Sequence, residues 1–127
     1  MKLSTLISRK SPPSSGNSAE LFARNYLEQQ GLVWQAQNFY NRAGEIDLIM
    51  KDGKTLVFVE VKYRKNASYG GPLAAVSSAK QQKIKQCATF FLQQEKLNAY
   101  NTDCRFDVVG LLGDLQSPEV TWLKNAF

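Results

Sequence analysis

The chain has no histidine in its 127 residues. This absence excludes histidine as a general acid or base, Ser–His and Cys–His nucleophile pairs, and zinc sites that use histidine ligands. It also excludes the nucleases that work through histidine. Any catalytic chemistry must therefore come from carboxylates, lysine, tyrosine or cysteine.

Cysteines and long hydrophobic runs are scarce as well. The two cysteines, Cys87 and Cys104, show no metal-ligand spacing, and we predict that both pack in the core as small apolar residues. The apolar stretch over residues 3–7 is too short for a secretory signal. No segment approaches the roughly 20 apolar residues of a membrane helix. We therefore expect a cytoplasmic protein with reduced thiols and no membrane span.

Basic residues, in contrast, are in excess. The 16 Lys and Arg residues outnumber the 11 Asp and Glu residues, and the formal net charge of +5 attracts polyanions. The length fits one domain with a substantial core. Residues 1–16 are rich in Ser, Pro and basic residues, which predicts a flexible basic arm ahead of a folded domain over residues 17–127. The composition leaves open whether this arm contacts DNA or has no role.

Hydrophobic periodicity predicts two helices and five strands in the order αβββαββ. The second helix has a clear apolar stripe, and the long crossover that contains it predicts a parallel strand pair on either side. Together these elements indicate an α/β fold in which helices pack on a mixed sheet of about five strands. The predicted helices cover residues 17–30 and 77–95, the strands cover 32–40, 44–50, 55–62, 104–112 and 120–123, and the stripe comprises Ile84, Cys87, Ala88, Phe91 and Leu92.

Charged side chains interrupt the otherwise apolar strands of the central hairpin, where unpaired carboxylates are costly to bury. The Asp-Gly turn signal at residues 52–53 predicts a register in which Lys51 pairs with Lys54. Because side chains alternate along a strand, this register places Asp47, Glu60 and Lys62 on one face. Asp47 and Glu60 are then diagonal neighbours, with backbones about 7–8 Å apart.

This arrangement of two acids and a lysine fits phosphodiester cleavage. Asp47 and Glu60 are suited to share one Mg²⁺ or Mn²⁺ ion, and the ion would offset the cost of burying them. Lys62 is positioned to steady the attacking water or to neutralise charge on the phosphate. The structural alternative is a buried ion pair of Lys62 with one of the acids and no chemistry.

The same residues resemble the PD-(D/E)xK nuclease signature of the restriction-endonuclease-like fold. The chain as a whole, from about residue 15 to the end, resembles the YraN family, which is similar in turn to archaeal Holliday junction resolvases. The resemblance implies a restriction-endonuclease-like core with Asp47, Glu60 and Lys62 as the motif residues and a fourth acid at Glu20. Ile46 stands where the motif has proline, which leaves the metal ligand intact. The segments that match are residues 44–49 (GEIDLI), 58–64 (FVEVKYR), 105–109 (RFDVV) and 125–127 (NAF).

Two further acids have alternative interpretations. Glu20 fits a capping box over residues 17–20, in which it would reach back to the start of the first helix, and the resemblance instead implies a place in the metal site. Glu45 is either a third acid of the cluster or an exposed charge at the start of a strand. We expect Asp107 to pair with Arg105, a lysine or the backbone rather than with a metal.

Several basic and aromatic residues are candidates for nucleic-acid contact. Lys80 and Gln81 lie in the first turn of the second helix, where a bound phosphate would be favourable. A loop after the hairpin alternates aromatic and basic residues, which suits phosphate contact and base stacking as well as it suits an ordinary exposed loop. The candidates in or next to this loop are Tyr63, Arg64, Lys65 and Tyr69.

The sequence thus predicts an endonuclease that depends on Mg²⁺ or Mn²⁺ and acts on DNA, either branched or single-stranded. The first alternative is a nucleic-acid-binding module that keeps the fold and the basic surface without catalysis. The second is a protein-interaction role in which the charged cluster is structural. The oligomeric state is left open between a monomer and the homodimer that a two-fold symmetric DNA junction would favour.

Overall fold

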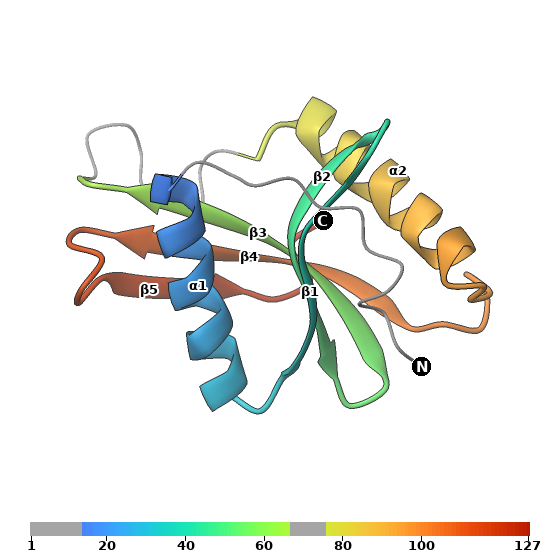
Figure 1. Ribbon diagram of the computed structural model, residues 1–127, viewed down its shortest axis with the longest axis horizontal. Coiled ribbons are helices and arrows are strands. Elements are labelled where there is room, and N and C mark those ends of the chain that lie inside the picture. The colour runs from blue at the N-terminus through green and yellow to red at the C-terminus, as the bar shows by residue number, and fades with distance from the viewer. Residues whose placement is uncertain (1–13, 67–75) are drawn as a thin grey trace.

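The computed structural model of the protein describes residues 14–66 and 76–127, with side chains described from residue 18 onward. These residues form two helices and five strands in the predicted order (Figure 1). Neither described helix is both long and apolar enough to cross a membrane. The elements are α1 (Ser14–Gln29), β1 (Val33–Asn41), β2 (Gly44–Asp52), β3 (Thr55–Arg64), α2 (Ser78–Gln94), β4 (Cys104–Leu112) and β5 (Glu119–Leu123).

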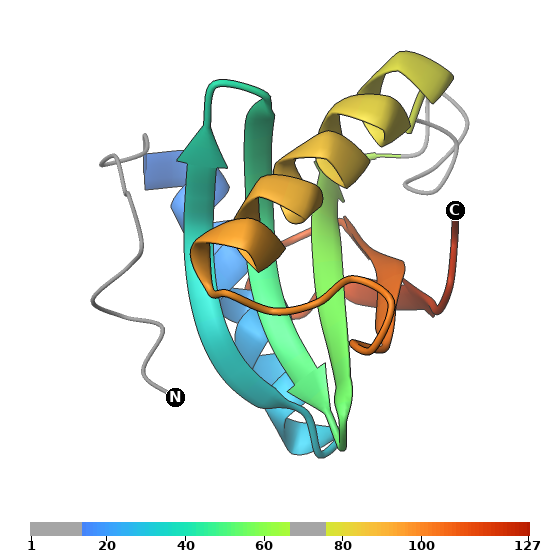
Figure 2. The ribbon, with the colours of Figure 1, turned by 90° about the vertical axis from the view of Figure 1, so that its right-hand side faces the viewer.

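The five strands form one mixed sheet in the order β1-β2-β3-β4-β5. Neighbouring strands are antiparallel except for β3 and β4, which are parallel. The parallel pair is joined through α2, as the crossover in the sequence predicts. α1 and α2 cover opposite faces of the sheet (Figures 1 and 2). The predicted α/β class with a mixed sheet flanked by helices is therefore confirmed.

Each helix packs its apolar stripe on one face of the sheet. On the α2 face every residue of the predicted stripe is buried, and Phe91 meets Phe39 and Phe58 edge to face at 5.1 and 5.9 Å between ring centroids. On the α1 face Ala19 and Ala23 allow the helix to lie close to apolar strand residues. Both cysteines are free; Cys87 of α2 is buried in the core as predicted, and Cys104 of β4 is partly buried against it.

The first helix begins earlier than its sequence pattern predicts. α1 starts at Ser14 rather than at residue 17, so residues 14–16 belong to the helix and not to the predicted arm. The remainder of that arm, residues 1–13, lies outside the described residues. Because of the earlier start, Glu20 lies in the second turn of α1. The capping-box interpretation of Glu20 is therefore wrong.

The central hairpin has a register that differs by two residues from the predicted one. Asp52 pairs with Thr55 and Leu48 with Val59, so Gly53 and Lys54 form the two-residue loop. Gly53 has a φ of 62°, which the first central residue of a type II′ hairpin turn requires and which glycine adopts without strain. The predicted pairing of Lys51 with Lys54 is wrong. A shift by two residues nevertheless keeps each side chain on its face.

The alternation of faces itself fails at one point of β2. Ile49 and Ile46 both pack on the α2 face although they are three residues apart, whereas Leu48 packs on the α1 face. A regular strand would place Ile46 and Ile49 on opposite faces. The irregularity lies at Asp47, between Ile46 and Leu48. The regular alternation from which the sequence predicts a common face for Asp47 and Glu60 therefore does not hold in this part of β2. The candidate site is built around this irregularity.

Candidate functional site

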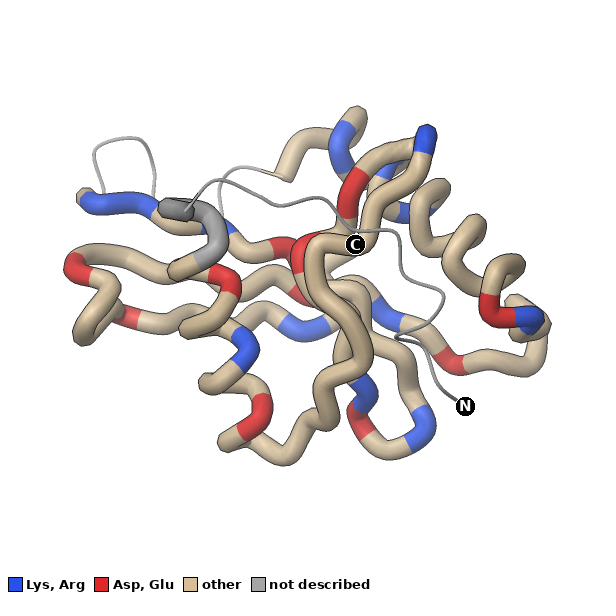
Figure 3. Tube along the Cα trace, in the orientation of Figure 1, with Lys and Arg blue, Asp and Glu red and all other residues tan. Residues whose placement is uncertain are grey.

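A cavity of about 300 Å³ opens where the beginning of α1, the first half of β2, the end of β3 and the beginning of α2 meet. Acidic positions lie here between the basic end of β3 and the basic first turns of α2 (Figure 3). This setting combines concentrated negative charge with cations at its rim. The residues that line the cavity are Ala19, Glu20, Asp47, Glu60, Val61, Lys62, Tyr63, Arg64 and Lys80.

The cavity exists because β2 and β3 stop pairing at Asp47. Their last backbone pair is Leu48 with Val59, and one step further the Asp47 carboxylate takes the place of a backbone acceptor. The Val61 N–H donates to Asp47 Oδ2 at 2.8 Å. Beyond this point β2 pairs with β1 alone and packs against α2, as Figure 2 shows. A carboxylate at the branch point thus holds its own strand to β3 while the strands diverge.

Glu20 of α1 approaches Asp47 from the face of the sheet that α1 covers. Burial raises the pKa of Glu20 to about 7, against the lowering effect of hydrogen bonding to Asp47 and with a further increase from the charge of Glu45. Its Oε1 atom is buried without a hydrogen-bond partner. Glu20 therefore belongs to the acidic cluster and has unused capacity to bind a proton or a cation.

The pKa of Asp47 is raised by the same two causes, burial and neighbouring acids. Burial raises its pKa well above the ordinary value, and the negative charges of Glu60 and Glu20 raise it further. The Val61 N–H and the charge of Lys80 oppose this increase without cancelling it. The protein has thus placed a carboxylate where its ionised form is unfavourable unless another positive charge is present.

Glu60 has such a positive charge in contact with it. Its side chain is only 5% exposed, and Lys80 Nζ lies 2.9 Å from its Oε2. Against the lowering effect of burial, the hydrogen bond to Glu60 and the charges of Glu60, Asp47 and Glu45 raise the pKa of Lys80. Lys80 comes from the first turn of α2, which Ser77 caps by accepting the backbone N–H of Lys80 at 3.1 Å.

The other predicted site residues divide into two groups. Lys62 and Arg64 line the cavity with the three acids. Glu45 is exposed and does not line the cavity, although its charge raises the pKa of Glu20. The geometry therefore unites Glu20, Asp47, Glu60, Lys62, Arg64 and Lys80, with Tyr63 at the wall.

Three candidates for nucleic-acid contact are engaged elsewhere or lie apart. Gln81 Nε2 donates to the Val76 carbonyl at 3.0 Å, and Gln81 does not line the cavity. Lys65 is exposed beyond it. The hydroxyl of Tyr63 donates to the Gly113 carbonyl at 2.8 Å, which ties β3 to the end of β4 and favours a structural role for that ring. Tyr69 lies outside the described residues.

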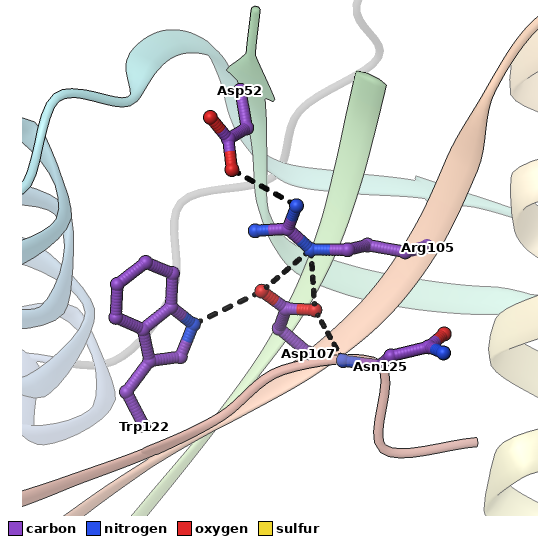
Figure 4. A network of polar contacts seen from close by, with 5 residues as sticks. All are labelled: Asp52, Arg105, Asp107, Trp122 and Asn125. Carbon is purple, nitrogen blue, oxygen red and sulfur yellow. Dashed lines mark hydrogen bonds and ion pairs between the residues drawn. The ribbon is translucent and has the colours of Figure 1, made fainter.

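Asp107 has a structural role, as predicted. Its side chain is 0% exposed, and both of its oxygens accept from Arg105 Nε, at 3.0 and 3.2 Å. The Trp122 indole N–H and the Asn125 backbone N–H donate to it at 3.0 and 2.9 Å, while Arg105 Nη1 also pairs with Asp52 at 2.9 Å (Figure 4). This network joins β4 to the end of β2 and to the residues after β5. None of its five residues is among the described residues that line the cavity.

Asn38 is a residue of the site that sequence reasoning missed. It lies on β1 between residues that pair with Leu48 and Ile46, which places it level with Asp47. Its φ of 52° is uncommon for a residue other than glycine, it is 4% exposed, and hydrogen bonding to it lowers the pKa of Glu20. Its Oδ1 has no partner among the described residues. Asn38 is one of four amide residues in the nine of β1, so the sequence did not distinguish it from its neighbours.

The described carboxylates do not lie close enough together to form a complete metal site. Among the residues that the structure describes, no three acids or cysteines are close enough together to hold a metal ion as they stand. The donor types nevertheless suit Mg²⁺ or Mn²⁺, which prefer carboxylate oxygens and are often held by only one or two of them. The raised pKa of Asp47 and the unpartnered Oε1 of Glu20 also indicate a place that would accept a cation.

Comparisons with known proteins identify the family. Residues 19–111 match the model of a family described as "Uncharacterised protein family UPF0102". The chain belongs to this family. A UPF0102 protein of Colwellia psychrerythraea is 57% identical over 117 residues, covering 92% of this chain and 91% of the relative. The UPF0102 protein YraN of Escherichia coli is 47% identical over 113 residues, covering 89% and 83%. The YraN resemblance seen in the sequence is thus confirmed for this UPF0102 member.

The acidic cluster leads to a prediction about stability and pH. Because the pKa of Glu20 is raised from 4.5 to about 7, its contribution to stability is fully present below pH 4.5 and is lost as the pH rises through 7. Glu20→Gln cannot ionise and should be more stable than the native protein at pH 8, by about 1 kcal/mol after allowance for solvent screening. The difference should shrink at pH 5.

Urea unfolding at both pH values, with a chelator present, measures this effect. Glu119→Gln, an exposed acid on β5, is the matched control and should change neither midpoint. A loss of stability in Glu20→Gln at pH 8 would contradict the prediction, because it would show that the ionised carboxylate stabilises the fold.

Proposed function

We propose that this protein is a metal-dependent endonuclease that cleaves DNA, with branched or single-stranded DNA as the expected substrate. The observation that carries the proposal is the meeting of Asp47, Glu60 and Glu20 in one cavity with cations at its rim. Carboxylates that are held close together despite their mutual repulsion indicate a site that binds a positive charge. The PD-(D/E)xK resemblance of the hairpin supports the same chemistry.

Asp47 and Glu60 would hold Mg²⁺ or Mn²⁺, and Glu20 would support them. A divalent ion bound there would supply an activated water and neutralise charge on the phosphate. Lys62 would orient the water or stabilise the negative charge of the transition state, as a fixed cation at the reacting centre does. Arg64 and Lys80 at the rim would bind the phosphates on either side. A homodimer is part of the proposal where the substrate is a two-fold symmetric junction.

The proposal is tested by incubating the purified protein with linear duplex, single-stranded and four-way-junction DNA. We expect cleavage of at least one of these substrates with Mn²⁺ or Mg²⁺ and none with a chelator. Glu119→Gln should cleave like the native protein. Binding of all three DNAs without cleavage of any would overturn the nuclease proposal in favour of a nucleic-acid-binding module. Absence of binding even at low salt would point to the protein-interaction role.

A further inference from the structure

Lys80 is paired with Glu60, one of the two carboxylates that the proposed metal ion would need as ligands. Glu60 is almost completely buried, and its Oε2 is paired with Lys80 Nζ at 2.9 Å. The Lys80 side chain is 48% exposed, so one end of this ion pair is tied inside the protein while the other reaches in from solvent. The backbone of Lys80 is fixed by the Ser77 cap, which leaves the side chain as the movable part.

The rest of the cavity makes this pairing distinctive. Lys62 and Arg64 also line the cavity, but neither forms an ion pair with an acid among the described residues. The charges of Asp47 and Glu45 add to the attraction of Glu60 for Lys80. Among the described residues, Lys80 is therefore the cation of the cavity that is paired with an acid, and its ammonium group engages Glu60 Oε2.

We propose that Lys80 is an exchangeable cation, which holds Glu60 until a divalent ion replaces it and then binds a phosphate of the nucleic acid. The inference rests on the proposed function and adds to it an order of events. Two cations cannot both occupy the same buried carboxylate without strong repulsion, so an ion at Asp47 and Glu60 would expel the ammonium group. A lysine released at the rim of the cavity would be within reach of the polyanion that enters there.

The exchange predicts opposite effects of one substitution on two kinds of binding. Lys80→Met removes the competitor, so Mn²⁺ should bind about three- to tenfold more tightly than to the native protein in the absence of DNA. The same variant should bind a four-way-junction DNA about three- to tenfold more weakly in Ca²⁺, with a salt dependence reduced by about one phosphate contact. A lysine with a purely structural role would not move the two affinities in opposite directions.

Isothermal titration calorimetry at pH 8 measures the Mn²⁺ affinity of four proteins: the native protein, Lys80→Met, Lys80→Arg and Lys83→Met. Lys80→Arg keeps a cation on Glu60 and should bind Mn²⁺ no more tightly than the native protein. Lys83→Met removes an exposed charge from the same helix and should bind Mn²⁺ within about twofold of the native protein. Circular dichroism establishes that each variant is folded, and Lys80→Gln replaces Lys80→Met if the latter is not.

The outcomes separate this inference from the proposed function. If the native protein binds Mn²⁺ but Lys80→Met binds it equally or more weakly, the exchange is wrong and the metal site stands. Unchanged junction binding by Lys80→Met would also overturn the exchange. If the native protein binds no Mn²⁺, or if Asp47→Asn binds it equally well, the proposed metal site fails and the exchange fails with it.

Discussion

Asp47→Asn is expected to abolish metal-dependent DNA cleavage and, in the absence of metal, to make the fold more stable. The amide oxygen of asparagine can still accept the Val61 N–H, so the branch point between β2 and β3 is kept. The ionised ligand is lost, and we expect cleavage to fall by at least about 10³-fold. Because burial raises the pKa of Asp47, ionisation destabilises the native state as the pH rises, and asparagine avoids this cost.

Two measurements on the same variant test this prediction. Cleavage is followed on the substrate that the native protein cuts best, and urea unfolding is followed at pH 8 with a chelator. Glu119→Gln serves again as the acid-to-amide control and should alter neither quantity. Cleavage that survives in Asp47→Asn would remove Asp47 from the catalytic site. A lowered unfolding midpoint would favour the alternative in which Asp47 is a stabilising ion-pair partner.

Asp107→Ala is expected to cost about 3–5 kcal/mol of stability, a large part of the 5–15 kcal/mol typical of a whole domain. The carboxylate is fully buried and accepts from Arg105, Trp122 and Asn125. Its removal would leave the partly buried N–H donors of Trp122 and Asn125 without this acceptor and Arg105 with Asp52 as its remaining partner. An N–H donor that loses its acceptor adds a desolvation cost to the extent that water cannot reach it.

Urea unfolding of Asp107→Ala against the native protein measures this cost, with an unchanged m-value as the sign that the folded state is intact. Asp103→Ala is the matched control, since Asp103 is an exposed aspartate just before β4, and its midpoint should shift by less than about 0.5 kcal/mol equivalent. A change below about 1 kcal/mol in Asp107→Ala would show that the network of Figure 4 contributes little to stability.

The two predictions assign opposite roles to two buried acids, and their partners explain the difference. Asp107 is surrounded by donors that use both of its oxygens. Asp47 has one backbone donor and two neighbouring acids that repel it. An acid with fully satisfied hydrogen bonds stabilises a fold, whereas an acid among acids is kept for another purpose at a cost in stability.

Sequence patterns predicted most of the fold because the elements repeat one physical rule. The stripe of α2 recurs every three or four residues, and every residue of the stripe is buried in the structure. The predicted bounds of β4 match the structure at both ends, since the mainly apolar segment Cys104 to Leu112 lies between polar and turn residues at 101–103 and 113–114. The turn residues predicted the hairpin but not its register, because Gly53 can occupy either central position of a two-residue hairpin loop.

The candidate site was predicted only in part, because its geometry depends on departures from regular structure. The residues Asp47, Glu60 and Lys62 could be found as charges in apolar strands. The separation of β2 from β3 at Asp47, the left-handed backbone of Asn38 and the approach of Glu20 from α1 have no periodic signal. Each of them results from contacts between segments far apart in the sequence.

The sequence by itself determined the class of fold, the absence of histidine chemistry and the acids available for a metal. Local periodicity and composition are properties of neighbouring residues, so they can be recognised before the chain is folded. Only the tertiary structure decided which charges meet. It brought Glu20 to Asp47, placed Lys80 on Glu60 and surrounded Asp107 with donors, because side chains from different elements become neighbours only after packing.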